Sequence, residues 1–238
     1  MLAFLPDWVH PVAEYMAREG LKGTARVAVI SVLASLFVGV PLGTLLTIRF
    51  LPSRALIRLY IEIWRGLPII VTIFMIYFLL PKLGPSFRFD PFISAAIGLS
   101  LWGSAQVAEA TRGAVESIPR EQHEAAAALG FGWVGRHVFL ILPQAFRRLL
   151  PPLVSLLVNI IQNTTLAQVL GAAELLETGE RSVERLTAPS VGPHGEFIPG
   201  HQHAFEIYGA VMVVFFLISF PLTRLAAYLE SRLQREGV

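Results

Sequence analysis

Four polar side chains recur at roughly helical spacing inside an otherwise apolar stretch of the chain: Ser155, Asn159, Gln162 and Asn163. Polar groups within a membrane-spanning helix usually face the protein interior or a water-filled cavity. Asn and Gln carry both hydrogen-bond donors and acceptors, which suits a zwitterionic solute such as an amino acid. The stripe therefore predicts the lining of a solute pathway. The alternative is hydrogen bonding between neighbouring helices, which contributes about 0.6 to 2 kcal/mol per contact.

A second polar group lies in another apolar stretch and forms a second candidate lining: Ser104, Gln106 and Glu109. Glu62 and Arg65 lie three residues apart near the start of a further apolar stretch. Their spacing predicts an ion pair within one helix, at the cytoplasmic surface of the membrane.

The residue types offer little for catalysis. The chain has no cysteine, which excludes disulfides, thiol chemistry and cysteine-ligated metals. Its sequence contains no G-x-x-x-x-G-K-[ST] phosphate loop, no H-E-x-x-H and no visible Ser/His/Asp arrangement, so we expect neither an enzyme nor a bound cofactor or metal. His201 and His203, with His194 and Glu196 nearby, are of metal-ligand type, but a solvated loop is the preferred interpretation.

A polar, alanine-rich block at residues 121–130 interrupts the apolar segments. Pro119 lacks an N–H group, which costs nothing in the first turn of a helix, and Glu121 lies at the positive end of the helix dipole. Residues 120–129 therefore predict a short helix, and Gly130 suits the left-handed position that follows it. Residues 133–142 predict a second short helix, which Pro143 ends.

This block indicates a docking surface, because a membrane protein rarely keeps such a segment between two spans without a partner. Small alanine side chains let a partner approach the backbone closely. Phe131 and Trp133 give that surface an apolar anchor. The alternative is a solvated helical hairpin with no partner.

The elements that position these residues are long and apolar. Of 238 residues, 54% are hydrophobic and only 15% are charged, against about 25% charged residues in soluble domains. Because a span needs about 20 apolar residues, we predict an all-α membrane protein with about five spans, in a single domain over residues 1–238. The expected spans are residues 27–48, 59–80, 92–108, 149–173 and 207–223. A net charge of +2 is too small to indicate nucleic acid.

The distribution of basic residues predicts the orientation. Lysine and arginine collect in cytoplasmic loops, and one set of alternate segments carries twelve of them against seven in the other. This bias places the N-terminus outside and the C-terminus in the cytoplasm. Residues 1–20 are then an external segment without the features of a signal peptide, residues 116–148 a cytoplasmic loop and residues 174–204 an external loop. Residues 2–20 mix aromatic and acidic side chains, which is typical of an amphipathic helix on the membrane surface.

The block resembles the cytoplasmic coupling loop of ABC transporter permeases, whose pattern is Glu-Ala-Ala, then Gly, then a hydrophobic residue and Leu-Pro. The matching residues are Glu124, Ala125, Ala126, Gly130, Leu142 and Pro143. Over roughly residues 24–233 the chain is similar to the polar amino acid, or histidine/glutamine-type, branch of binding-protein-dependent importers. Segments 61–68, 109–119, 142–152 and 162–166 carry this likeness. The branch commonly has Thr at Leu67 and Lys-Asp at Gln162 and Asn163, so this chain departs from it there.

The resemblance implies the fold of a type I ABC importer in the bacterial inner membrane. Two permease subunits, identical or paralogous, would span the bilayer. Two cytoplasmic ATPase subunits would bind ATP, and an external substrate-binding protein would deliver an amino acid. In that scheme the residues that couple the permease to the ATPase are Glu121, Glu124, Ala125, Ala126, Gly130, Phe131, Leu142 and Pro143.

Three alternatives stay open at this point. The nearest is an importer of the same architecture for a different small solute. A stand-alone secondary transporter is another, but it needs ionisable groups inside the membrane, and the fourth and fifth expected spans have none. A membrane-embedded enzyme is the third, and the missing catalytic arrangement disfavours it.

Overall fold

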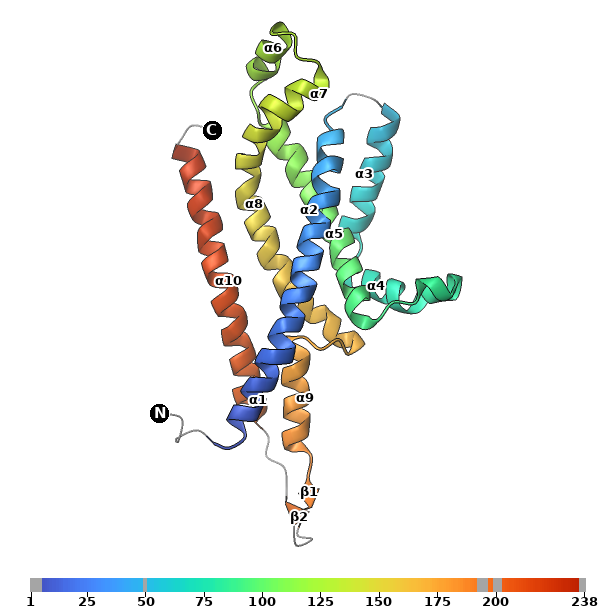
Figure 1. Cartoon of the computed structure of the whole chain (residues 1–238), viewed down its shortest axis with the longest axis vertical. Helices are drawn as coiled ribbons and strands as arrows, with labels where there is room; N and C mark the ends of the chain where they lie inside the picture. The colour runs from blue at the N-terminus through green and yellow to red at the C-terminus, as the bar shows by residue number, and fades with distance from the viewer. Residues whose placement is uncertain (1–5, 49–50, 192–196, 199–202, 236–238) are drawn as a thin grey trace.

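The computed structural model describes residues 6–48, 51–191, 197–198 and 203–235. These residues form an elongated helical bundle with a short antiparallel ribbon at one end, β1 (Ser190–Val191) paired with β2 (Phe197–Ile198) (Figure 1). The described residues contain four helices long and apolar enough to cross a membrane, or five spans if one bent pair is counted. The helical membrane fold with about five spans is thus confirmed.

The first span is longer than predicted. It is one helix of 37 residues that consists of α1 (Val9–Tyr15), a π-helical turn (Met16–Leu21) and α2 (Lys22–Leu45). The N-terminal segment therefore continues the span from residue 9 onward, and the expected separate helix lying on the membrane surface is wrong.

Two glycines let this long helix pack closely against another part of the chain. A Cβ added at Gly23 would lie 1.9 Å from the carbonyl oxygen of Ala173, and one at Gly20 would lie 2.2 Å from Oγ1 of Thr178. The bare helix backbone therefore packs directly against α9 (Leu175–Thr187) and the residues before it. Such small residues at contacts between membrane helices let backbones approach closely.

The second span is broken. The helical stretches Arg54–Gly66 and Ile69–Leu83 are bent by 102° at Leu67 and Pro68, so the span predicted over residues 59–80 consists of two helices with a sharp bend between them. Pro68 has no N–H to continue the hydrogen-bond pattern, and its ψ of 131° is extended rather than helical. The elements involved are α3 (Leu51–Gly66), α4 (Ile69–Phe74), a π-helical turn (Met75–Leu79) and two 3-10 turns (Leu80–Leu83 and Pro85–Phe87).

The ion pair predicted between Glu62 and Arg65 on α3 is also wrong. No ion pair within 4.0 Å joins them among the residues that the structure describes. Both side chains are exposed on α3, where water competes with a pairing of this kind.

The central helix of the bundle is α5 (Pro91–Glu116), which extends the span predicted over residues 92–108 at its C-terminal end. Asp90 caps it by accepting a hydrogen bond from the N–H of Ile93 at 2.9 Å. The helix packs along α2, where a Cβ added at Gly43 would lie 2.3 Å from the carbonyl oxygen of Ala108. Close packing of these two helices therefore depends on a glycine.

The fourth span begins inside the predicted cytoplasmic loop. The elements of this region are α6 (Arg120–Ala128), α7 (Trp133–Arg136), a π-helical turn (His137–Ile141), α8 (Leu142–Asn163) and a 3-10 turn (Thr164–Leu170). From Trp133 to Leu170 the elements after α6 form one continuous helix of 38 residues, which is long and apolar enough to cross a membrane. The stretch ends at Gly171, whose φ of +76° reverses the chain.

The segment predicted as an external loop, residues 174–204, is helical in its first half, because α9 lies there. Glu174 begins this helix by accepting the N–H groups of Leu176 at 3.0 Å and Glu177 at 2.8 Å. Thr24 on α2 accepts the N–H of Leu175 at 3.1 Å, which joins α9 to the first span. Burial raises the pKa of the Glu174 carboxyl. The last helix, α10 (Ala204–Arg235), contains the predicted fifth span.

The ends of the bundle agree with an odd number of crossings. The α6–α7 loop and the C-terminal end of α10 lie at one end, whereas α1 and the β-ribbon lie at the other (Figure 1). The two termini therefore lie at opposite ends, as predicted. The side of the membrane that each end faces stays a prediction, and so does the treatment of residues 1–238 as one domain.

Candidate functional site: the α6–α7 loop and the polar face of α8

The turn after α6 is a tight helix ending built on Gly130. Gly130 has a φ of +83°, which confirms the predicted left-handed conformation. Its N–H donates to the carbonyl of Ala127 at 2.9 Å, and the N–H of Phe131 donates to the carbonyl of Ala126 at 3.1 Å. This pair of bonds is the Schellman ending of a helix, which requires a left-handed residue. A Cβ added at Gly130 would meet no atom within 4 Å, so only backbone strain opposes a side chain there.

The tip of the α6–α7 loop exposes apolar side chains to solvent. Leu129 is 76% exposed, Val134 is 66% exposed and Phe131 is 39% exposed. Neither Leu129 nor Val134 belongs to the predicted docking residues, although an apolar residue in a polar loop is itself a signal. Together with the small alanines of α6, these three side chains form a surface that a partner protein can cover.

The structure places the predicted docking residues in different surroundings. Those exposed at or near the tip are Glu121, Glu124, Ala125, Gly130 and Phe131. Ala126 is only 1% exposed, so it supports the loop from inside. Trp133 stacks on His137 with ring centroids 4.0 Å apart, and thus packs within the loop instead of serving as a free anchor. Leu142 and Pro143 lie at the start of α8, away from the tip.

Pro143 does not end the helix that precedes it, which corrects the sequence-based prediction. α7 continues into α8 through the π-helical turn at His137–Ile141. A proline inside a helix removes one backbone donor and its ring clashes with the carbonyl four residues earlier. The wider π-helical turn displaces that carbonyl, so the chain passes Pro143 without a break.

His137 connects the loop to the end of the first span. Its ring is buried, with Nδ1 2.9 Å from the carbonyl oxygen of Trp133 and Nε2 3.4 Å from Oγ1 of Thr47, just beyond α2. Arg136 donates to the carbonyl of His123 on α6 at 3.4 Å. Burial lowers the pKa of His123, and the charge of Arg136 lowers it further, so this ring is neutral near pH 7. The adjacent residues Arg136 and His137 thus contact both α6 and the end of the first span.

The polar stripe of α8 lies on an exposed face. Ser155, Asn159 and Gln162 are exposed, and Asn163 is half-buried. The Nδ2 of Asn163 donates to the backbone carbonyl of Asn159 at 2.7 Å, so this amide is partly engaged within its own helix. The other three side chains follow one line along a membrane-spanning helix and are open to a partner or to water.

The second candidate set does not form one surface. Ser104 is 1% exposed and its hydroxyl lies 2.6 Å from the Tyr60 hydroxyl, at the contact between α3 and α5. Gln106 follows two residues later, which places it about 200° further around the helix. Glu109 pairs with Arg112 on its own helix, and Arg112 also pairs with Glu116. The structure therefore separates Ser104 from the other two residues.

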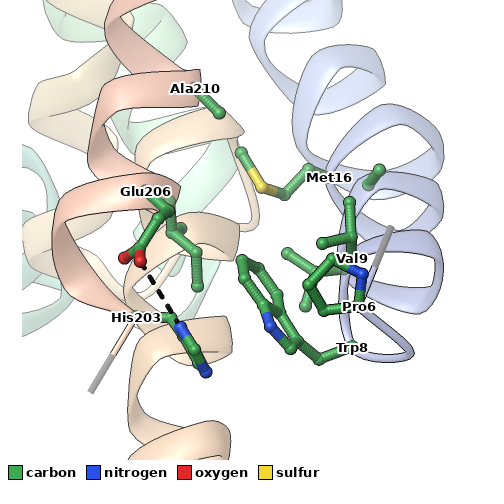
Figure 2. Close-up of a pocket in the computed structure, with 10 residues that line it drawn as sticks. Pro6, Trp8, Val9, Met16, His203, Glu206 and Ala210 are labelled. Atoms are coloured by element: carbon green, nitrogen blue, oxygen red, sulfur yellow. Dashed lines mark ion pairs between the residues drawn. The ribbon is translucent and has the colours of Figure 1, made fainter. Parts of the chain in front are cut away.

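His203 is one of the two histidines, with His201, that the sequence marks as being of metal-ligand type. It lines an apolar cavity of about 430 Å³ at the N-terminal end of the bundle (Figure 2). Its ring stacks on Trp8 with centroids 4.3 Å apart, and its Nδ1 lies 3.7 Å from Oε1 of Glu206. His194, Glu196 and His201 lie outside the described residues. Among the residues that are described, no three His, Cys, Asp or Glu side chains gather into a metal site.

A family model described as the binding-protein-dependent transport system inner membrane component matches residues 39–235. The matched stretch includes the α6–α7 loop and the polar face of α8. The chain belongs to this family. The membrane-spanning permease fold implied by the resemblance of the α6–α7 block is thereby confirmed.

Curated relatives of this permease are similar over almost their whole length. The glutamine transport system permease protein GlnP of Escherichia coli K12 is 34% identical over 216 residues, which cover 91% of this chain and 92% of the relative. The probable glutamine ABC transporter permease protein GlnP of Bacillus subtilis is 29% identical over 214 residues, 90% of this chain and 92% of the relative.

Solved structures share the fold of this permease. A crystal structure of an amino acid ABC transporter with histidines superposes with a TM-score of 0.77 at 22% identity, and the match covers 96% of this chain and all of that chain. An inward-facing MetNI methionine ABC transporter superposes with a TM-score of 0.70 at 16% identity, over 94% of this chain and 99% of that one. The bent second span and the long first span thus belong to a fold found in ABC importers.

Proposed function

We propose that this permease is one of two membrane subunits of an ATP-driven importer of polar amino acids. The two relatives described above are permeases for glutamine, and another relative is a glutamate/aspartate import permease, which supports the substrate class. An external substrate-binding protein delivers the amino acid, and two cytoplasmic ATPase subunits hydrolyse ATP. The permease itself forms the pathway and catalyses no reaction.

The observation that carries this proposal is the exposed polar line on α8. Ser155, Asn159 and Gln162 lie in a span and are left exposed by the described part of the chain. Moving an amide into hydrocarbon without a hydrogen-bond partner costs roughly 2–7 kcal/mol. Two such amides on one face make contact with lipid unfavourable. A second permease subunit facing α8 across a hydrated pathway satisfies them, and the same amides then bind a passing amino acid.

The α6–α7 loop supplies the second half of the proposal. Its exposed apolar tip fits the surface of an ATPase, with Glu121 and Glu124 at the polar rim. The contacts of His137 join the loop to Thr47 and hence to the first span. Movement of the ATPase on ATP binding therefore reaches the bundle and switches the pathway from one side to the other.

Transport by the reconstituted complex tests the function. The permease is purified with its partner ATPase and binding protein and placed in proteoliposomes. We expect uptake of radiolabelled glutamine that needs both ATP and the binding protein, while maltose is not taken up. Uptake driven by a sodium or proton gradient without ATP would instead identify a secondary transporter, and uptake of maltose would contradict the amino acid assignment.

The proposed orientation has a separate test by reporter fusion. Fusions after Arg148 and after Arg235 are expected to be cytoplasmic, and one between Pro189 and Gly200 external, because the excess of basic residues lies with the first two. The measurement is paired alkaline phosphatase and fluorescent protein activity at each site. An external signal after Arg148 would reverse the orientation and remove the α6–α7 loop from reach of an ATPase.

A further inference from the structure

A cleft of about 410 Å³ opens between α8 and α10 near the α6–α7 end of the bundle. Its walls also include Ser117, the residue that ends α5. The two helices that form it lie side by side in Figure 1. The cleft shares one lining residue with the polar stripe, Ser155, and the other three residues of the stripe do not line it.

Two opposite charges line this cleft without neutralising each other. Arg148 contributes from α8 and Glu230 from α10. Among the described residues, no ion pair within 4.0 Å joins these two side chains. The carboxylate of Glu230 is exposed to the cleft solvent. The cleft therefore has a positive wall and a negative wall with room between them.

Ser117 holds the guanidinium of Arg148 in place. One nitrogen, Nη1, donates to the Ser117 carbonyl at 2.5 Å and lies 2.9 Å from the Ser117 hydroxyl. A guanidinium has five N–H donors in a rigid fork. Its Nε is buried and therefore out of reach of a ligand in the cleft. The hydrogen bonds to Ser117 use Nη1 alone, so the donors left for an anionic group are those of Nη2, which has no hydrogen bond within the described part of the chain.

These features define one chemical class of ligand. We infer that the cleft binds a zwitterion with a primary ammonium group, its anionic end on Arg148 and its ammonium on Glu230. A fork of donors suits a carboxylate or phosphate, and a carboxylate accepts hydrogen bonds from an ammonium. The apolar wall at Pro151 and Leu233 takes the short aliphatic part of the ligand. The cleft volume lies within the range typical of small-molecule sites, about 300–1,000 Å³.

This chemistry has two sources near a membrane. A free amino acid carries a carboxylate and an ammonium, and the headgroup of phosphatidylethanolamine carries a phosphate and an ammonium. Both fit between the same two walls. The two charged residues that would hold the ligand, Arg148 and Glu230, are not part of the α8 stripe, so a test of them is separate from a test of the proposed function.

Protection of an introduced cysteine tests the site locally. The chain has no cysteine of its own, so Leu233→Cys places a single thiol in the cleft. The full-length variant is placed in nanodiscs of phosphatidylglycerol and treated with a water-soluble maleimide. Titrated L-glutamine should slow labelling at least fivefold if free amino acids bind. If the headgroup binds, labelling should instead slow fivefold when phosphatidylethanolamine is added to the nanodiscs. A cysteine at Ala227, exposed on the same helix but outside the cleft lining, should be unaffected.

Charge variants in the Leu233→Cys background identify the walls. Glu230→Gln should raise the half-protecting ligand concentration tenfold or more, because a charged hydrogen-bond partner is lost. Arg148→Gln should do the same, whereas Arg147→Gln, an exposed neighbour outside the lining, should not. Glu230→Gln is the decisive variant, since Arg148→Gln also removes the contact with the end of α5. The inference would be overturned if neither L-glutamine nor phosphatidylethanolamine slowed the labelling of Leu233→Cys. Unchanged protection in Glu230→Gln would overturn it as well.

Discussion

Gly130→Val should separate ATP hydrolysis from transport, or detach the ATPase altogether. The valine would have to adopt a φ of +83°, which costs a β-branched residue on the order of 1–3 kcal/mol. Relief of that strain redirects the chain after α6 and misplaces the apolar tip at Leu129 and Phe131. We expect little ATPase to co-purify with the variant, and substrate-stimulated ATP hydrolysis in proteoliposomes to fall at least tenfold.

Neighbouring positions provide matched controls for this change. Gly132 has a φ of −63° and open space around it, so Gly132→Val should be tolerated. Gly130→Asn should retain most of the coupling, because asparagine tolerates the left-handed region. Glu124→Ala should act mildly, since it removes one rim contact and leaves the backbone in place. Wild-type association and stimulation in Gly130→Val would show that the α6–α7 loop is not the docking element.

Asn159→Leu and Gln162→Leu should each reduce amino acid transport at least tenfold while the complex still assembles. Leucine is favourable in lipid and in helices, so insertion and folding should survive. The change removes the amide donors and acceptors that the proposed pathway offers to a zwitterion. The measurement is ATP-dependent glutamine uptake in proteoliposomes, with co-purification of the ATPase as the test of assembly.

A substitution on an exposed apolar helix shows whether a loss of transport is specific to the polar stripe or follows from any change in a membrane helix. Met212→Leu on α10 changes a side chain that is 72% exposed on an apolar helix, so transport should stay at the wild-type rate. If both α8 variants also transport normally, the polar stripe only joins helices and the solute passes elsewhere. A further outcome is that Asn159→Leu and Gln162→Leu no longer assemble into the complex while Met212→Leu does. That result would place the two amides at the contact between subunits.

Features set by local chemistry followed from the sequence alone. The apolar stretches predicted a helical membrane protein with about five spans, because each span must satisfy its backbone hydrogen bonds internally. Pro119 and Gly130 marked the two ends of α6, since a proline suits the first turn and a glycine suits the left-handed position after the last. The polar stripe was visible because 3.6-residue periodicity stands out in an apolar span.

Features set by contacts between distant segments required the tertiary structure. Gly20 and Gly23 let α9 approach the first helix, although the two segments lie about 150 residues apart in sequence. The local sequence of residues 9–26 does not predict that contact. Pro143 predicts a helix end by itself, but packing of α8 against α5 holds the helix together through a π-helical turn. Ala126 and Ser104 are of types found both on surfaces and in contacts, and only their neighbours decided that both are buried. Backbone conformation depends mainly on a few adjacent residues. Burial of a side chain depends on which other helix packs against it, and the arrangement of the helices is a property of the whole bundle.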